Sequence, residues 1–187
     1  MTQGPPQVRQ VGRVQGKSVF LRNVQLEDAP FILSLRLDPH KSRYVSPVDP
    51  DVEKQRAWIR QYLASQGQAY FIICDLAGEA LGTVRIYDAV GDSFSWGSWM
   101  MKQGAPAAAA IESAGLVYRL ATEVWGFRAA HFQVHRANTS VVAFHEKFGA
   151  QRVWETDEEI GYSIGLDAIG QSLRRYARYL PQRLLVE

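Results

Sequence analysis

Three strand patterns follow one another in the middle of the chain, and no other feature constrains the fold as much. Residues 69–75 form a continuous apolar run, which is typical of a buried strand. Residues 81–88 alternate between apolar and polar side chains, and residues 94–101 form a third strand pattern. The connections at Gly78 and Gly91 are only turn-sized, and such short connections join antiparallel strands. The sequence therefore predicts an antiparallel meander.

Helical and strand patterns also lie on both sides of this meander. Helices are expected at residues 29–37, 51–66, 107–125, 138–148 and 167–180. Further strands are expected at residues 17–22, 131–135, 151–155 and 160–164. Helices set among mostly hairpin-linked strands predict an α+β fold with one or two parallel strand pairs. Residues 1–16 lack periodicity, so we expect a flexible leader followed by a single domain at 17–187.

The composition narrows the classes of function. The 187 residues are 47% hydrophobic and 21% charged, which is the ordinary globular range, and the net charge is +2. That balance gives no clustered basic surface, so nucleic acid is not an expected partner. The longest apolar run, Ala69–Cys74, is far too short to span a membrane, and the first residues lack the apolar core of a signal peptide. A single cysteine, Cys74, fits a reducing cytoplasm.

Two motif-like patterns fail on their spacing or their context. Residues 12–18 place three residues between their glycines, whereas a phosphate-binding loop needs four and a helix after them. His131 and His135 have a metal-ligand spacing for a helix, but they lie in a strand pattern without a Cys pair or an acidic cluster. We therefore expect no metal site.

The segment 102–108 is a stronger candidate, because small residues there precede a long helix. The loop and the four alanines at 107–110 leave the N-terminus of that helix sterically open. Free backbone N–H groups and the positive end of a helix together suit an anion such as a pyrophosphate. An ordinary helix start is the alternative, since alanine is the best helix former.

Residues 134–150 carry the most specific pattern, in which a strand, an asparagine and a helix ending in Phe-Gly follow one another. The segment resembles the corresponding one of GNAT-superfamily N-acetyltransferases. The matching positions are Asn138, Glu146, Lys147 and Gly149. The element order is similar to that family as far as about residue 165. The resemblance implies a GNAT-like mixed, mostly antiparallel central sheet flanked by helices, to which the C-terminal helix at 167–180 is added.

Two groups within the superfamily are similar to the opening of this chain. They are the ribosomal-protein N-terminal (Rim-type) acetyltransferases and the bacterial nucleotide-amino-sugar N-acetyltransferases. The similar segments are Leu35-Arg36, Arg43-Tyr44-Val45 and Trp58-Ile59.

The resemblance implies acetyl-CoA as the acetyl donor. The residues expected to bind it are Met101, Gln103, Gly104, Ala105, Pro106, Ala107, Ala108 and Asn138. Gln103 and Ala108 match the pyrophosphate loop of the family, whereas Pro106 replaces its first glycine and lacks an N–H donor. Asn138 is expected first as a helix cap, and in this family its position also reaches the CoA arm.

The resemblance implies a candidate general acid but no general base. The family uses a tyrosine to protonate the departing thiolate, and His145 stands at that position, where a histidine can serve as the general acid. The alternative is that His145 only packs on an apolar stripe of its helix. Backbone N–H groups at 99–101 would polarise the thioester carbonyl, as in this family. The general base stays open between Glu112, Asp88, Asp92 and a relay through water.

The acceptor is expected in the loop between the first two helices. Lys41, Arg43 and Tyr44 lie there, and cations beside an aromatic ring suit a phosphorylated or nucleotide-linked acceptor. A solvated loop balanced by aspartates is the alternative. The predicted function is acetyl transfer to the primary amine of a small molecule, with a nucleotide-linked amino sugar as the leading acceptor. A Rim-type protein acetyltransferase and a non-catalytic acyl-CoA-binding domain are the alternatives, and a homodimer is left open.

Overall fold

The structure is a computed structural model that describes residues 4–187, and its strands form one sheet. The strands are β1 (Arg13–Gln15), β2 (Val19–Asn23), β3 (Ala69–Asp75), β4 (Ala80–Val90), β5 (Ser93–Met101), β6 (Ala129–His135), β7 (Gln151–Glu155), β8 (Glu159–Gly165) and β9 (Leu185–Val186). The helices are α1 (Ala29–Arg36), α2 (Val52–Leu63), α3 (Ala107–Arg119), α4 (Thr139–Phe148) and α5 (Leu166–Arg175). Shorter 3-10 turns lie at Leu26–Asp28, Ser42–Tyr44 and Ala177–Tyr179, and a π turn at Leu120–Val124 extends α3.

The sheet confirms the predicted fold class. Its strand order is β7-β8-β6-β5-β4-β3-β2-β1-β9, and every neighbouring pair is antiparallel except β5 and β6. That one parallel pair follows from α3, since a helix between two neighbouring strands carries the chain back to the starting edge. The predicted meander is present as β3, β4 and β5.

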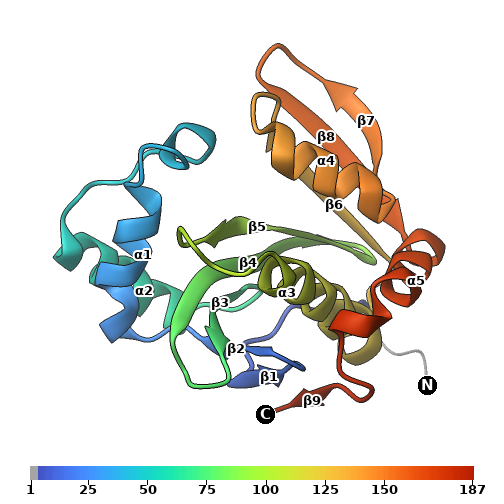
Figure 1. Cartoon of the computed structure of the whole chain (residues 1–187), viewed down its shortest axis with the longest axis horizontal. Helices are drawn as coiled ribbons and strands as arrows, with labels where there is room; N and C mark the ends of the chain where they lie inside the picture. Colours follow the sequence, from blue (N-terminus) through green and yellow to red (C-terminus); the bar gives the residue numbers. More distant parts are fainter. Residues whose placement is uncertain (1–3) are drawn as a thin grey trace.

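Helices cover both faces of the sheet, because successive side chains of a strand point to opposite faces. Tyr70 and Ile72 of β3 pack against α1 and α2. Phe71 and Ile73, which alternate with them, pack in the larger core that contains α3. Figure 1 shows α1 and α2 together at one end of the molecule and α4 and α5 at the other. The middle of the sheet is therefore buried on both faces.

β5 and β6 separate soon after they begin. They pair only at Ser93 with Ala129 and at Phe94 with Ala130. From there β6 pairs along its whole length with β8 instead. Figure 1 shows β6, β8, β7 and α4 rising away from β5 as one arm. We call this group of elements the β6–β8 arm.

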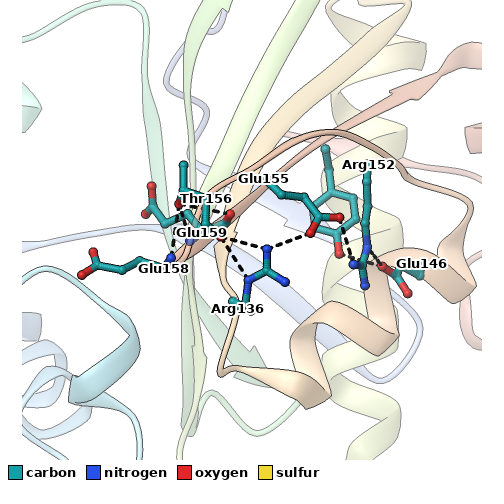
Figure 2. Close-up of polar contacts among 8 residues, drawn as sticks. Arg136, Glu146, Arg152, Glu155, Thr156, Glu158 and Glu159 are labelled. Atoms are coloured by element: carbon teal, nitrogen blue, oxygen red, sulfur yellow. Dashed lines mark hydrogen bonds and ion pairs between the residues drawn. The ribbon is translucent and has the colours of Figure 1, made fainter.

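Ion pairs tie α4 to the hairpin in this arm (Figure 2). Arg152 of β7 bonds to Glu146 of α4, with Nε 2.6 Å from the carboxylate, and also to Glu155. Arg136 bonds to Glu155 at 2.7 Å and to the carbonyl oxygen of Thr156. The hydrogen bond from Arg152 is the main cause that lowers the pKa of Glu146. Both arginines thus favour the ionised form of the carboxylates that hold the arm together.

The N-terminal segment differs from the flexible leader expected at residues 1–16. Val8 is only 2% exposed, and the Gln10 side-chain amide donates to the carbonyl oxygens of Tyr62 and Ser65 at 3.0 Å each. β1 pairs with β2 on one side and with β9 on the other. The segment is therefore packed from Val8 onward, while residues 1–3 lie outside the described part of the chain. The prediction failed because these contacts join segments far apart in the sequence.

The other boundaries shift by a few residues. The helix expected at 167–180 ends at Arg175 and is followed by a 3-10 turn. The strand expected at 17–22 begins at Val19. Within residues 4–187, the helices are all too short or too polar to cross a bilayer.

Candidate functional site

The separation of β5 from β6 leaves one edge of β5 without a strand partner. Beyond Phe94, no strand pairs with that edge among residues 4–187. Backbone N–H and C=O groups on such an edge are available to bind another extended chain. A ligand with amide groups of its own fits this edge, because the backbone can hydrogen-bond to it in the manner of a strand.

A β-bulge redirects the backbone of β5 near its end. The register with β4 shifts between the pairs Arg85–Gly97 and Thr83–Met100, so β5 carries one extra residue there. Ser98 has φ of +46°, and its carbonyl oxygen accepts a hydrogen bond from Thr83 Oγ1 at 2.7 Å. A non-glycine residue at positive φ is strained, and such strain is often found at functional sites. The polarising N–H groups predicted at 99–101 directly follow this bulge.

A cavity of about 530 Å³ lies at this end of β5. The end of β5, the first turns of α3 and α4, and the loop between α1 and α2 all line it. Its volume is in the range of small-molecule sites. Of the residues predicted to bind donor or acceptor, the cavity brings together Lys41, Tyr44, Met101, Ala107 and Asn138.

The N-terminus of α3 opens on one side of this cavity. Pro106 is the N-cap residue, and no side chain caps the helix. The Ala109 N–H donates to the Pro106 carbonyl oxygen at 2.9 Å, so the uncapped N–H groups are those of Ala107 and Ala108. Gly104, with φ of +82°, turns the chain just before it. The predicted loop residues Gln103, Gly104, Ala105, Pro106 and Ala108 do not line the cavity themselves.

Asn138 occupies the N-cap position of α4 but does not cap it. Its side chain accepts no hydrogen bond from the backbone N–H groups of the first turn, so the predicted side-chain cap is wrong. The Ser140 hydroxyl lies 3.4 Å from Asn138 Oδ1, and both residues line the cavity. The amide is therefore placed beside the cavity rather than against the helix end. Gly149, with φ of +106°, does end the helix as expected.

His145 lies behind the cavity wall and does not line it. It is only 4% exposed, and its Nδ1 has no hydrogen-bond partner among the described residues. Five aromatic rings lie within 6.2 Å of it, between centroids: Trp96, Trp99, Phe132, Phe144 and Tyr162. Burial lowers the pKa of the imidazole to about 3. A general-acid role stays a prediction, and it requires Trp99 or Phe144 to move.

None of the three candidate bases lines the cavity. Glu112 is 1% exposed and accepts hydrogen bonds from the backbone N–H groups of Lys17 and Ser18, so its lone pairs are occupied. Asp88 lies near the end of β4, with its carboxylate 3.4 Å from His131 Nε2. Asp92 is in the turn before β5, at the opposite end of that strand from the cavity.

The loop between α1 and α2 reaches across to the β6–β8 arm. The Tyr44 ring lies 5.6 Å from the His135 ring, centroid to centroid, at the end of β6. The Arg43 guanidinium lies 4.7 Å from the Tyr44 ring, whereas Lys41 is paired with Asp38 at 3.2 Å. Tyr44 and Lys41 line the cavity and Arg43 does not.

Sequence reasoning missed several residues of this site. The His135 ring lies beside Tyr44, which lines the cavity, and the position of His135 at the end of a strand before the Asn138 helix is the sequence signal for it. Trp99 and Phe144 line the cavity, and their spacing in the sequence carried no sign of this. Among residues 4–187, no cluster of three or more metal-ligating side chains occurs.

Comparisons with known proteins agree with this geometry. The family model for the acetyltransferase (GNAT) domain matches residues 18–151. The apo structure of FdhC, described as a nucleotide-linked sugar GNAT, is 35% identical, with a TM-score of 0.79 over 90% of this chain and 98% of that one. A GCN5-related N-acetyltransferase from Brucella melitensis has a TM-score of 0.79 at 16% identity, over 97% of this chain and 91% of that one.

A spermidine N-acetyltransferase from Vibrio cholerae, solved in complex with CoA and spermine, has a TM-score of 0.71 at 14% identity. It covers 81% of this chain and 98% of its own. No curated protein sequence matches significantly. Because the family model spans most of the chain and a 35% identical structure covers nine-tenths of it, the chain belongs to the GNAT acetyltransferase family.

Proposed function

We propose that the chain transfers the acetyl group of acetyl-CoA to the primary amine of a small molecule, with a nucleotide-linked amino sugar as the leading acceptor. The observation that carries this proposal is the single cavity at the end of β5. It is lined on one side by the start of α3 and on the other by the loop between α1 and α2. A donor and an acceptor that enter from these two sides meet at the bulge of β5.

The donor is assigned to the edge of β5 and the start of α3. The amides of the pantetheine arm suit the unpaired edge of β5, and the pyrophosphate suits the uncapped N–H groups of Ala107 and Ala108. The small residues Gly104 and Ala105 leave room for phosphate oxygens to approach the backbone. Asn138, which is free of a capping role, faces the same cavity. Pro106 has no backbone N–H group, but the N–H groups of Ala107 and Ala108 remain.

The chemistry needs a neutral amine, a polarised carbonyl and a protonated leaving group. The amine nitrogen bonds to the thioester carbon, and the negative charge that develops on its oxygen is stabilised by backbone N–H groups at 99–101. The C–S bond then breaks, and the thiolate takes up a proton while the nitrogen loses one. Because none of the carboxylates considered as bases lines the cavity, the amine proton leaves through water.

The acceptor is assigned to the side of the cavity formed by Lys41 and Tyr44, with Arg43 next to the Tyr44 ring. The Tyr44 ring with its neighbouring guanidinium offers a stacking and charged surface at the entrance. The similarity to a nucleotide-linked sugar GNAT, at 35% identity, supports an acceptor of that class. Cys74, the single cysteine, is buried and free, which fits a reaction in the reducing cytoplasm.

The test is a panel of amines incubated with acetyl-CoA, with release of free thiol as the readout. A nucleotide-linked amino sugar should release thiol, whereas a short peptide with a free N-terminus should not. Efficient acetylation of the peptide alone would replace the amino-sugar assignment by the Rim-type one. Tight binding of acetyl-CoA without thiol release from any amine would identify a non-catalytic acyl-CoA-binding domain.

A further inference from the structure

Two arginines on the α1–α2 face of the sheet have no carboxylate partner among residues 4–187. Arg85 of β4 is opposite Tyr70 of β3 and Gly97 of β5, and paired residues share one face of a sheet. Since Tyr70 packs in the core beneath α1 and α2, Arg85 lies on that same face. Arg36 is the last residue of α1, which packs over that face. Neither guanidinium is within 4.0 Å of an acidic side chain.

Arg85 is held in place by neutral groups alone. Its guanidinium lies 5.2 Å from the Trp58 ring and 4.8 Å from the Tyr87 ring. Its Nε donates to the Gln68 side-chain oxygen at 3.0 Å, and its Nη2 donates to the same atom. Nη1 has no partner. Burial lowers the pKa of Arg85, which shows that its positive charge is incompletely solvated.

Arg36 is similarly short of partners. Its Nη2 donates to the Ser46 carbonyl oxygen at 2.9 Å, while its Nε is buried and makes no hydrogen bond. The positive charges of Arg36 and Arg85 both lower the pKa of the Tyr70 hydroxyl, against the larger raising effect of burial. Arg85 is opposite Tyr70 in the sheet, so both guanidinium groups lie near the Tyr70 side chain. Two half-buried like charges are unfavourable unless an anion lies between them.

This pair of arginines adjoins the cavity at the end of β5. Met100 lines the cavity and is paired with Thr83, which is two residues from Arg85 on β4. Two residues of a strand span about 7 Å. Gly97, opposite Arg85, leaves room for the Tyr87 ring, because a Cβ there would lie 3.0 Å from the Tyr87 hydroxyl. One sugar ring can span a separation of about 7 Å between Arg85 and the cavity.

We propose that Arg36 and Arg85 bind the anionic part of the acceptor, a phosphate or diphosphate ester, while the amine lies in the cavity at the bulge. This inference rests on the proposed function, whose acceptor it specifies. Planar guanidinium groups bind phosphate oxygens in pairs, and Trp58 and Tyr87 hold the Arg85 fork in a fixed orientation. The arginines select the acceptor and take no part in the transfer of the acetyl group.

The first experiment measures binding alone, so it does not depend on catalysis. Uridine diphosphate is titrated by calorimetry into protein saturated with CoA, so that the donor site is already filled. Arg85→Gln and Arg36→Gln should each weaken the binding on the order of ten- to a hundred-fold, the loss expected for a charge-assisted hydrogen bond. Arg60→Gln, an exposed arginine of α2 without a partner, is the matched control and should bind as the wild type does.

The second experiment measures the acceptor KM. Arg85→Gln should raise the KM for a nucleotide-linked amino sugar and leave the KM for the same amino sugar without its nucleotide unchanged. Arg85→Lys keeps the positive charge but not the planar guanidinium group. Its KM for the nucleotide-linked amino sugar should lie between those of the wild type and Arg85→Gln. Each variant must bind CoA with wild-type affinity. If Arg85→Gln does not bind CoA normally, the KM comparison is made with Arg36→Gln.

The outcomes separate the inference from the proposed function. If wild-type protein does not bind uridine diphosphate, or if both glutamine variants bind it normally, the anion site is wrong, whatever amine is acetylated. If the variants lose uridine diphosphate binding but no amine is ever acetylated, the anion site stands and the proposed transfer fails. If the acceptor KM is unchanged and the free energy of unfolding is lower, then Arg85 only stabilises the packing of α2 against β4.

Discussion

At the scale of single residues, the burial of His145 affects both the stability of the fold and the role that this residue can play in catalysis. Its pKa of about 3 in the folded chain lies below the usual 6.5, so the folded state disfavours the charged imidazole. The unfolded chain binds a proton below about pH 6.5 and the folded chain does not. The free energy of unfolding should therefore decrease as the pH is lowered from 6.5 to 3, by up to about 1.4 kcal/mol per pH unit. Above pH 6.5 His145 should contribute no pH dependence.

Replacing the imidazole tests both expectations. His145→Phe removes the titrating group and the unpartnered Nδ1 while it keeps a ring of similar shape. A general acid at His145 predicts that turnover at pH 7.5 falls about a hundred-fold or more while acetyl-CoA binding stays intact. Turnover within a few-fold of wild type would leave His145 as a packing residue. In either case the loss of stability from pH 7.5 to pH 5, measured by urea denaturation at each pH, should be smaller than in the wild type.

Asn138 offers a separate test at this scale, because it occupies the N-cap position of α4 and its side chain does not cap the helix. An asparagine that caps a helix contributes about 1 kcal/mol, whereas this one accepts no hydrogen bond from a backbone N–H group of α4. Asn138→Ala should change the free energy of unfolding by less than about 0.5 kcal/mol. Since the amide lines the cavity, the KM for acetyl-CoA should rise. Thr139→Ala, the next residue along, is the control, and equal effects of the two variants on KM would contradict the assignment.

At the scale of elements, Glu112 links α3 to the turn between β1 and β2. Its carboxylate accepts hydrogen bonds from the backbone N–H groups of Lys17 and Ser18, and from the Ser18 hydroxyl. A buried donor that loses its partner costs about 1–3 kcal/mol. Glu112→Ala should lower the free energy of unfolding by that amount, measured by chemical denaturation.

The same residue distinguishes a structural carboxylate from a general base. Glu112→Gln keeps one acceptor oxygen, so it should fold and retain the wild-type dependence of kcat/KM on pH. Loss of the acidic limb of that profile would assign the base to Glu112 and would require α3 to turn toward the cavity. Asp167→Asn, a carboxylate at the start of α5, serves as the matched control.

The sequence was sufficient to predict the elements whose contacts are local. The meander of β3, β4 and β5 follows from alternation and short turns, and α4 follows from Asn138 and Gly149 at its ends. β1 and β9 were missed because three and two residues carry no periodicity, and their pairing joins the two ends of the chain.

The candidate site was predictable only where the pattern of the family extends. Tyr44, Met101 and Asn138 line one cavity, and their roles in binding donor and acceptor stay predictions. The burial of His145 and the isolation of Arg85 were not predictable, because each depends on rings contributed by several other elements. Spacing along one element does not report what packs against it from another.

At the scale of the whole molecule, the strands of the β6–β8 arm pair with β5 at only two residue pairs, and the other contacts are between side chains. A ligand that bridges β5, α3 and α4 should therefore stabilise the folded chain as a whole. Acetyl-CoA at a hundred times its Kd stabilises by about 2.7 kcal/mol if it binds only the folded state. For a chain of 187 residues this is a rise in Tm of roughly 5–11 °C, measured by scanning calorimetry. Acetyl phosphate, which lacks the CoA arm, is the control.

The absence of any shift with saturating acetyl-CoA would remove the donor assignment and with it both the enzymatic and the acyl-CoA-binding alternatives. A shift of equal size with acetyl phosphate would place the binding at an isolated anion site. A shift with acetyl-CoA alone would agree with a ligand that lies along the edge of β5.

The pairing of β1 with β9 has a consequence for synthesis on the ribosome. The N–H groups of Gly12 and Arg13 donate to the Glu187 carbonyl oxygen, and Val14 is opposite Val186. β1 leaves the exit tunnel before its outer neighbour, which is made more than 160 residues later. During that interval the nascent chain presents an open strand edge, which is a template for unwanted pairing with other chains. The chain must therefore be synthesised as far as β9 before this side of the sheet is closed.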